Sequence, residues 1–402
     1  MNQSFNSKEL IRYLKKGELI RNNLIKDVVV SEIDTLNQSI LNETFEFNIR
    51  DSGGFYFLDN ISEKLIMRKL NDNIKRIYKD EQANRKFIIQ QVKALLEEDS
   101  PFWIIKTDIK SFYESIDREW IFKKLKDDAM LSYYSIFLIK KIFKNTLVNN
   151  ITGLPRGLNV SATMSEIYMR RFDKWIKGHV GIYFYARFVD DIIIFISNKD
   201  HAINLYNNLE NKLKDLCALE VNNNKTELID GFNFKIINAK SNKKTIDNNI
   251  EYLGYKFFLE SFNKKRILNV SIADKKVNKI KTRVIKSFLD YRKNNDFSLL
   301  EKRIKFITGN YGISKNDDGS ILKAGIYFNY LHVNNEYVLS GLNFFLRKII
   351  FSKRKSFGHA LYPILSVAQK DILKKYCFKA GFKNKTYNSF KYSEMKQIIK
   401  CW

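Results

Sequence analysis

Apolar residues recur along the chain with two different spacings, and each spacing predicts a local structure. Apolar positions every three to four residues predict amphipathic helices, and short runs of β-branched and aromatic residues predict strands. The helical spacing covers residues 8–30, 61–79, 84–98 and 133–147, and a further helix that Asp117 caps and that runs through Leu125. Pro101 precedes a predicted strand over residues 102–109.

Two later segments are predicted to be β-hairpins, because in each of them two β-rich runs meet at a short turn. Residues 181–195 turn at Asp190-Asp191, and residues 250–258 form the second hairpin. Between them we expect a helix that Asp200 caps, followed by a strand with Leu228 and Ile229. The inward face of that helix is predicted to consist of Ile203, Tyr206, Leu209, Leu213 and Leu216. From about residue 270 onward the pattern is mainly helical.

The composition indicates a folded chain of two or three domains. Of its 402 residues, 45% are hydrophobic and 14% aromatic, which is enough to bury a large core. The sequence has no run of about 18 uncharged apolar residues and no N-terminal secretion signal, so we expect a cytoplasmic protein. The cysteines (Cys217, Cys377 and Cys401) are scattered, and neither they nor the four histidines have the spacing of a zinc site.

Positive charge is distributed unevenly. The chain has 70 Lys and Arg against 44 Asp and Glu, a net charge of +26, of which residues 1–260 carry +5 and residues 261–402 carry +21. An excess of this size favours a polyanionic partner, either nucleic acid or an anionic membrane. The alternative is a basic protein whose charge serves only its solubility.

Two acidic sites interrupt apolar strands, where a carboxylate is costly unless it is paired or bound to a metal. Asp108 ends one predicted strand, and Asp190-Asp191 lies at the tip of the first hairpin. At such a tip one of two adjacent acids can reach an acid on a partner strand. Two carboxylates from separate strands then make a hard-oxygen site suited to Mg²⁺. The alternative is a turn whose aspartates are simply solvated.

Five segments of the sequence carry recognisable motifs: residues 107–113, 153–157 with Ser161, 188–191, 224–226 and 252–255. They resemble, in family order, five motifs of reverse transcriptases. Residues 107–113 resemble the first catalytic motif, and residues 153–157 with Ser161 resemble the template- and nucleotide-positioning motif. Residues 188–191 resemble the aromatic-x-Asp-Asp hairpin, residues 224–226 the lysine motif and residues 252–255 the primer-grip hairpin. The resemblance covers residues 85–260 continuously.

Further strings differ from those of retron and intron enzymes and resemble the antiviral, defence-associated reverse transcriptases of bacteria. They lie at residues 153–158, 161–162, 165–170 and 185–191, and residues 2–5 and 303–311 extend the match toward both ends. Within this group the chain resembles the first polymerase of the type 3 defence systems. Those systems pair two reverse transcriptases with a non-coding RNA.

The resemblance implies an α+β right-hand polymerase fold, with fingers, a ferredoxin-like palm built on an antiparallel sheet, and a helical, basic thumb. It implies an N-terminal helical region and fingers over 1–100, a fingers and palm core over 101–260, a thumb over 261–310 and a basic extension over 311–402. The positive charge then falls on a thumb that tracks the duplex backbone and on an extension that binds folded RNA. The positive charge then no longer supports a membrane as the partner.

Residue roles follow from the same resemblance. Asp108, Asp190 and Asp191 are the expected catalytic residues. With the backbone carbonyl of Ile109, they are the expected ligands of two Mg²⁺ ions, for which Mn²⁺ is the alternative. The nucleotide-binding residues are expected to be Tyr113 as a gate against the ribose 2′-hydroxyl, Arg156, Gly157 and Lys225. Nucleic-acid contacts are expected from Tyr252, Gly254, Lys279, Arg283 and Lys286. For Arg187, an ion pair and a nucleic-acid contact are equally compatible with the sequence.

The implied activity is RNA-directed DNA synthesis, a nucleotidyl transfer that uses dNTPs to copy a non-coding RNA template into a DNA product. The implied setting is antiphage defence, with a second reverse transcriptase and a higher-order assembly as partners. Two alternatives are a retron- or group II intron-like reverse transcriptase and a non-catalytic RNA-binding scaffold on the palm fold. The three acids argue against a scaffold, because binding an anionic ligand does not require them.

Overall fold

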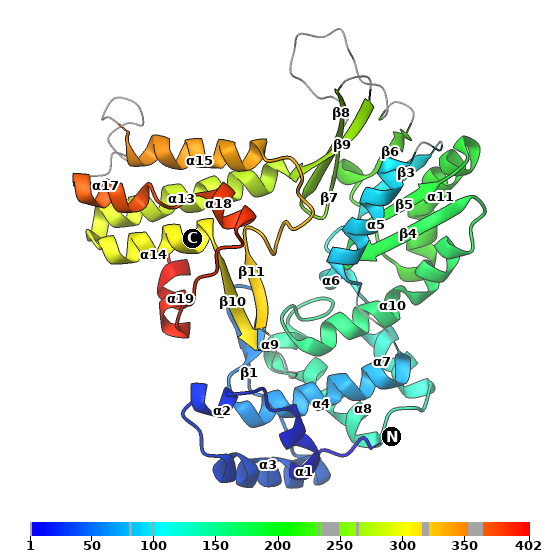
Figure 1. Cartoon of the computed structure of the whole chain (residues 1–402). Coiled ribbons are helices and arrows are strands. Elements are labelled where there is room, and N and C mark those ends of the chain that lie inside the picture. The colour runs from blue at the N-terminus through cyan, green and yellow to red at the C-terminus, as the bar shows by residue number, and fades with distance from the viewer. Residues whose placement is uncertain are drawn as a thin grey trace. The chain divides into compact units, whose positions relative to one another are not determined.

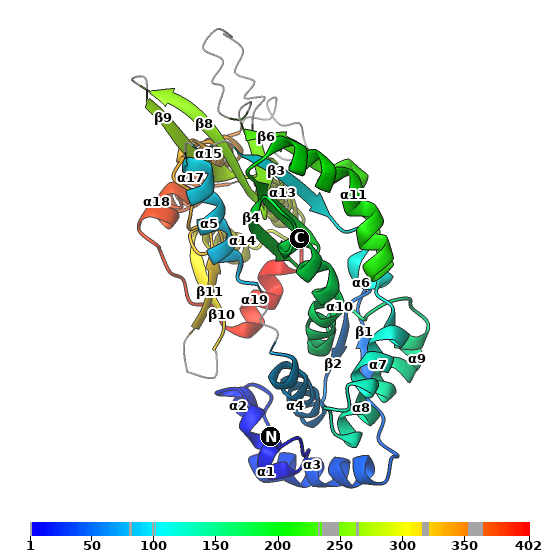
Figure 2. The ribbon, with the colours of Figure 1, turned by 90° about the vertical axis from the view of Figure 1, so that its right-hand side faces the viewer.

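The computed structural model describes residues 2–79, 83–98, 100, 102–231, 234, 249–262, 265–315, 321–352 and 365–402 (Figures 1 and 2). Pro101 lies outside these ranges. The chain divides into two compact units. Unit 1 comprises Met1–Ile88 and Asp99–Asn233, and unit 2 comprises Ile89–Glu98 and Phe234–Trp402. The finer division into fingers, palm, thumb and extension stays a prediction.

The core of unit 1 is a four-stranded antiparallel sheet in the order β4-β5-β3-β6. Its strands are β3 (Trp103–Asp108), β4 (Ile182–Phe188), β5 (Asp191–Ile196) and β6 (Glu227–Asp230). Helix α10 (Asn159–Lys177) leads into β4, and α11 (Lys199–Cys217) connects β5 to β6. This β-α-β-β-α-β connectivity and strand order confirm the predicted ferredoxin-like palm. Helix α11 packs along the sheet and against α10, as Figure 2 shows.

Strand β5 is buried on both faces, which fixes its register. Ile192, Ile194 and Ile196 point to one face and join the hydrophobic core that includes residues of α10 and α11. Phe195 points to the other face, where its ring packs against Phe102 and Phe184. A slip by one residue would turn every side chain to the opposite face, so the apolar run determines which residues meet at the end of the strand.

The single helix predicted over residues 8–30 is wrong. Four short elements replace it: α1 (Ser7–Leu10), the 3₁₀ helix η1 (Ile11–Tyr13), α2 (Glu18–Arg21) and the start of α3 (Lys26–Leu41). Leu14 is extended, and Gly17 has a φ of 71°, a left-handed conformation that ends helical hydrogen bonding. The short segments instead pack around α4 (Ile61–Tyr78), as both ribbon views show.

The other predicted elements of unit 1 are present with small shifts. Asp117 caps α7, since its carboxylate accepts hydrogen bonds from two backbone amides of the first turn. The Asp200 cap is wrong: Asn198, two residues earlier, accepts those bonds at the start of α11. The inward face also shifts, because Ile203 is exposed whereas Ala202 and Leu205 are buried. The remaining elements of unit 1 are β1 (Ile49–Asp51), β2 (Tyr56–Leu58), α6 (Phe112–Ser115), α7 (Arg118–Asp127), α8 (Tyr133–Lys144), α9 (Thr146–Asn149) and η2 (Asn223–Lys225). Helix α5 (Arg85–Glu97) belongs mostly to unit 2, which includes Ile89–Glu98.

Unit 2 begins with a three-stranded antiparallel sheet, of which the sequence predicted only the first hairpin. Strand β9 and the hairpin β10-β11 were missed by the mainly helical prediction after residue 270. The strands are β7 (Asn249–Tyr252), β8 (Tyr255–Phe262), β9 (Lys265–Ile272), β10 (Asn310–Lys315) and β11 (Ile321–Gly325). The helices are α13 (Asp274–Asn294), α14 (Phe297–Thr308), α15 (Tyr337–Ile350), α17 (Val367–Leu373), α18 (Phe378–Lys383) and α19 (Tyr392–Ile399). Helix α13 packs against α14 and α15 (Figure 1).

The helices in the described ranges are all too short or too polar to cross a membrane.

Candidate active site

The central sheet brings the predicted catalytic acids to one edge. Asp108, the last residue of β3, pairs directly with Asp191, the first residue of β5. Residues paired across antiparallel strands carry their side chains on the same face. Asp190 lies in the turn of the β4-β5 hairpin, and its backbone carbonyl accepts a hydrogen bond from the amide of Ile109 at 3.1 Å. The hairpin tip is thereby tied to the end of β3.

The carboxylate of Asp108 is buried and has two partners. Lys225 donates from its ammonium to Oδ2 at 2.8 Å, and Asn222 donates from its side-chain amide to Oδ1 at 3.3 Å. The hydrogen bond to Asp108 raises the pKa of Lys225, and the charges of Asp191 and Asp190 add to the effect. Lys225 therefore stays cationic beside the three acids, as its predicted contact with a nucleotide requires.

The acids fit a hard divalent cation in chemical type and in electrostatics. Burial raises the pKa of Asp190, and the charge of Asp108 raises it further, so the two carboxylates repel each other. A cation bound by both would relieve that repulsion. Within the described residues no three His, Cys, Asp or Glu side chains are grouped closely enough to hold a metal ion. The oxygen donors are therefore present, but a three-ligand geometry is not.

A cavity of about 420 Å³ opens beside Asp190 and brings together most of the predicted nucleotide-binding residues. Tyr113, Arg156 and Gly157 line it, whereas Lys225 does not. The guanidinium of Arg156 pairs with Glu114, with Nε 2.6 Å from Oε1 and Nη2 2.8 Å from Oε2, and lies over the Tyr113 ring. The other lining residues are Phe55, Phe112, Leu158, Asn159, Ser161 and Ala162.

Two glycines let the loop over residues 153–157 approach neighbouring backbone. Leu154 donates its amide to the carbonyl of Tyr113 at 2.7 Å, and the carbonyl of Arg156 accepts from the amide of Tyr56 at 2.7 Å. Gly153 and Gly157 have φ values of 68° and 101°, and a side chain at either position would collide with those partners. The loop thus forms one wall of the cavity because its glycines carry no Cβ.

We expect Gly157→Ala to raise the KM for dNTPs about tenfold and to lower the free energy of unfolding by about 1–3 kcal/mol. Its added Cβ would lie 2.5 Å from the carbonyl oxygen of Tyr56 and push the cavity wall outward. Gly17→Ala is the control, because Gly17 also has a positive φ but its Cβ would meet only the end of a flexible side chain at 3.7 Å. For both variants, steady-state kinetics measure the KM for dNTPs and thermal unfolding measures the stability. An equal change in KM in the control would contradict this role for the loop.

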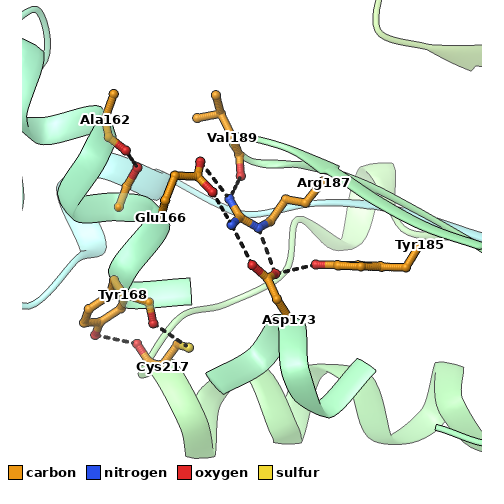
Figure 3. Close-up of polar contacts among 9 residues, drawn as sticks. Ala162, Glu166, Tyr168, Asp173, Tyr185, Arg187, Val189 and Cys217 are labelled. Carbon is orange, nitrogen blue, oxygen red and sulfur yellow. Dashed lines mark hydrogen bonds and ion pairs between the residues drawn. The ribbon is translucent and has the colours of Figure 1, made fainter. Parts of the chain in front are cut away.

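Arg187, whose role the sequence left open, forms an ion-pair network at the base of the β4-β5 hairpin (Figure 3). It is 8% exposed, and its guanidinium makes five hydrogen bonds: two to Asp173, two to Glu166 and one to the carbonyl of Val189 at 3.1 Å. Tyr185 donates to Asp173 at 2.6 Å. All five N–H donors of the arginine are used. The ion pair, rather than a nucleic-acid contact, is therefore what the structure shows.

The network holds the residue before the two hairpin aspartates in a strained conformation. Val189 has a φ of 61°, which a β-branched residue rarely adopts. Its carbonyl is bound by Arg187, and the two acids that bind Arg187 lie two turns apart on one face of α10. Helix α10 thus sets the position of the turn that carries Asp190.

Comparison with known families identifies the fold and its chemistry. Residues 57–257, half of the chain, match the family described as "Reverse transcriptase (RNA-dependent DNA polymerase)". The chain belongs to the reverse transcriptase family. It therefore carries the domain of a nucleotidyltransferase that polymerises DNA on RNA, a family that uses divalent metal ions.

Among solved structures, this reverse transcriptase is similar to telomerases from two yeasts. Telomerase from Candida albicans, in complex with a fragment of telomeric RNA, has 13% identity and a TM-score of 0.34 over 59% of this chain and 45% of that chain. Telomerase from Candida tropicalis, also with a telomeric RNA fragment, has 15% identity and a TM-score of 0.35 over 79% and 51%. The chain thus spans about half the length of these structures. No curated protein matches the sequence.

The nucleic-acid contacts predicted for the reverse transcriptase all lie in unit 2. Tyr252 is buried, so its ring is not available for stacking, and Gly254 forms the β7-β8 turn with a φ of 82°. Lys279 and Lys286 are exposed on α13. Arg283 is half-buried, with its guanidinium 5.1 Å from the centre of the Trp402 ring. These contacts stay predictions. Of the basic residues in the predicted extension, Lys353, Arg354 and Lys355 lie outside the described ranges.

Several site residues were not predicted. Glu114 pairs with Arg156 and Asn222 contacts Asp108, and both lie within or beside a recognised motif. Glu166 and Asp173 could have been predicted from the sequence, since acids seven residues apart on a helix share a face and can both contact one buried arginine. Phe55 lines the cavity from the distant β1-β2 turn, and no local pattern indicates it.

Proposed function

We propose that this reverse transcriptase copies a non-coding RNA template into DNA in bacterial antiphage defence, as the first polymerase of a type 3 system. We further propose that it does so in the cytoplasm with a second reverse transcriptase in a higher-order assembly. The strings shared with defence-associated enzymes support the setting. The observation that carries the catalytic part is the register that pairs Asp108 with Asp191 while Asp190 lines the nucleotide-sized cavity.

In this proposal a primer 3′-hydroxyl attacks the α-phosphate of a dNTP seated in the cavity, and pyrophosphate leaves. Asp108, Asp190 and Asp191, with the carbonyl of Ile109, would hold two Mg²⁺ ions, or Mn²⁺. Bound there, such ions would lower the pKa of the hydroxyl and neutralise the leaving group. Lys225 adds a fixed cation beside the acids, and Arg156 can turn from Glu114 toward the triphosphate because its side chain is 44% exposed.

Tyr113 is proposed to exclude ribonucleotides. It is half-buried in the cavity wall, and its ring lies beneath the Arg156 guanidinium. We expect Tyr113→Ala to raise the relative kcat/KM for ribonucleotides by about 100-fold, because the ring would no longer exclude a 2′-hydroxyl. Tyr113→Phe is the control and should keep the discrimination of the wild type. Single-nucleotide incorporation with dNTP and rNTP pairs measures the ratio, and unchanged discrimination in Tyr113→Ala would remove the gate role.

The template assignment is tested by sequencing the nucleic acid that co-purifies with the protein and the DNA that it makes from dNTPs. One abundant non-coding RNA with complementary DNA product supports the proposal. An RNA folded like a retron or intron precursor would instead support the retron- or intron-like alternative. A non-catalytic scaffold would retain RNA and yield no DNA.

A further inference from the structure

Helices α7 and α8 line a second cavity, of about 450 Å³, and no residue lines both this α7-α8 pocket and the nucleotide cavity. The two helices and their connection concentrate positive charge. Residues 118–144 contain seven Lys and Arg against three Asp and Glu, a net charge of +4, whereas all of residues 1–260 carry only +5. Four of these cations, Lys126, Lys140, Lys141 and Lys144, line the pocket.

Three cations of the pocket have no acidic partner. Lys126, Lys140 and Lys144 are exposed, and no carboxylate of the described residues lies within ion-pair distance of them. The two acids of the lining are already engaged. Glu43 accepts a hydrogen bond from the hydroxyl of Tyr133 at 2.5 Å, and Glu46 pairs with Lys141. The lysines are therefore available for an anionic ligand that carries several charges.

The same lining presents aromatic surface. Tyr133 is 63% exposed, and two contacts orient its ring: the hydrogen bond to Glu43 and an edge-on contact with the Tyr134 ring, whose centroid lies 5.5 Å away. Phe122 and Phe137 line the pocket beside it. An exposed, fixed ring beside unpaired lysines is the combination that binds single-stranded nucleic acid, with a base on the ring and phosphates on the cations. A duplex would offer no free base face to the ring.

We propose that the α7-α8 pocket binds a single-stranded segment of RNA outside the catalytic cavity. The choice of RNA over DNA rests on the proposed function, in which the template is RNA and continues unpaired beyond the copied position. The preference for a single strand rests on the pocket alone. The bound segment would anchor the template without contributing to the chemical step.

The test uses the full chain and fluorescence anisotropy with labelled oligonucleotides: single-stranded RNA, single-stranded DNA and double-stranded RNA, each at several salt concentrations. Replacing Lys126, Lys140 and Lys144 together with alanine should weaken single-stranded RNA binding about tenfold. It should also make the slope of log affinity against log salt concentration shallower by about 2. Each phosphate contact with a single strand contributes about 0.7 to that slope, and the variant loses three such contacts. Tyr133→Ala should weaken binding about tenfold without changing the slope.

The matched control replaces Lys174, Lys212 and Lys214, three exposed lysines of α10 and α11, with alanine. It removes the same charge and should leave the affinity and slope near those of the wild type. Equal losses in the two triple variants would overturn the proposal, as would an equal effect on double-stranded RNA. An equal effect on single-stranded DNA would overturn the assignment to RNA. Incorporation of dNTPs on a short primer-template should stay unchanged, so a failure of the proposed polymerase function is detected separately.

Discussion

Exchange of Asp108 for asparagine is expected to lower kcat for dNTP incorporation by about a thousandfold. The exchange keeps the size of the side chain but removes the charge that Lys225 contacts and that a divalent ion would need. A thousandfold loss corresponds to about 4 kcal/mol of lost transition-state stabilisation. Stability should change little, because the loss of the ion pair with Lys225 is offset by relief of the repulsion between Asp108 and Asp190.

Asp117→Asn is the control for this prediction. Asp117 carries the same charge close by in the sequence, and asparagine caps a helix as well as aspartate does. Single-turnover kinetics and thermal unfolding should show normal activity and normal stability in the control. Comparable kcat values for Asp108→Asn and Asp117→Asn would contradict the catalytic role of Asp108.

Arg187→Lys is expected to lower kcat about 100-fold and the free energy of unfolding by about 2–3 kcal/mol. Lysine has three donors in place of five, so it cannot bind both Glu166 and Asp173 and also hold the Val189 carbonyl. A shift of the hairpin turn by about 1 Å is enough for a loss of this size. The KM for dNTPs should stay close to that of the wild type, because Arg187 does not line the nucleotide cavity.

Arg68→Lys separates this positioning role from a general loss of stability. Arg68 also makes two bonds to a carboxylate, that of Glu18, and one to a backbone carbonyl, that of Tyr13, but it lies in the N-terminal helices. Both variants should be destabilised, and only Arg187→Lys should lose kcat when the rates are compared at equal fractions of folded protein. Equal kcat in the two variants would show that the Arg187 network is only structural.

The palm could be predicted from the sequence because the patterns that indicate its strands and its acids are local and strong. The apolar run of β5 fixes its own register, and the acids that interrupt the apolar strands mark the candidate catalytic edge before any pairing is known. The resemblance of the motifs around them to those of reverse transcriptases then implied the antiparallel, ferredoxin-like palm that the structure has. The Asp117 cap and the hairpin at Asp190-Asp191 could be predicted for the same reason.

The sequence predictions failed where two local patterns indicated different structures, or where a residue contacts another that is distant in the sequence. Gly17 interrupts an otherwise continuous helical pattern, and Asn198 and Asp200 are equally good caps two residues apart. Arg187 meets acids that lie 14 and 21 residues before it, and a single sequence cannot choose between them and nucleic acid. The positions of Phe55 and Asn222 depend on how the chain folds back on itself.

The central claim, that Asp190 and Asp191 support DNA synthesis on RNA, is tested most directly by incorporation of labelled dNTPs by the purified protein with its co-purifying RNA. Wild type is compared with a variant in which both aspartates are replaced by alanine, and RNA content and thermal unfolding are measured for both. We expect labelled DNA from the wild type and none above background from the variant, with the RNA retained. Equal labelling of DNA by the two proteins would contradict the account.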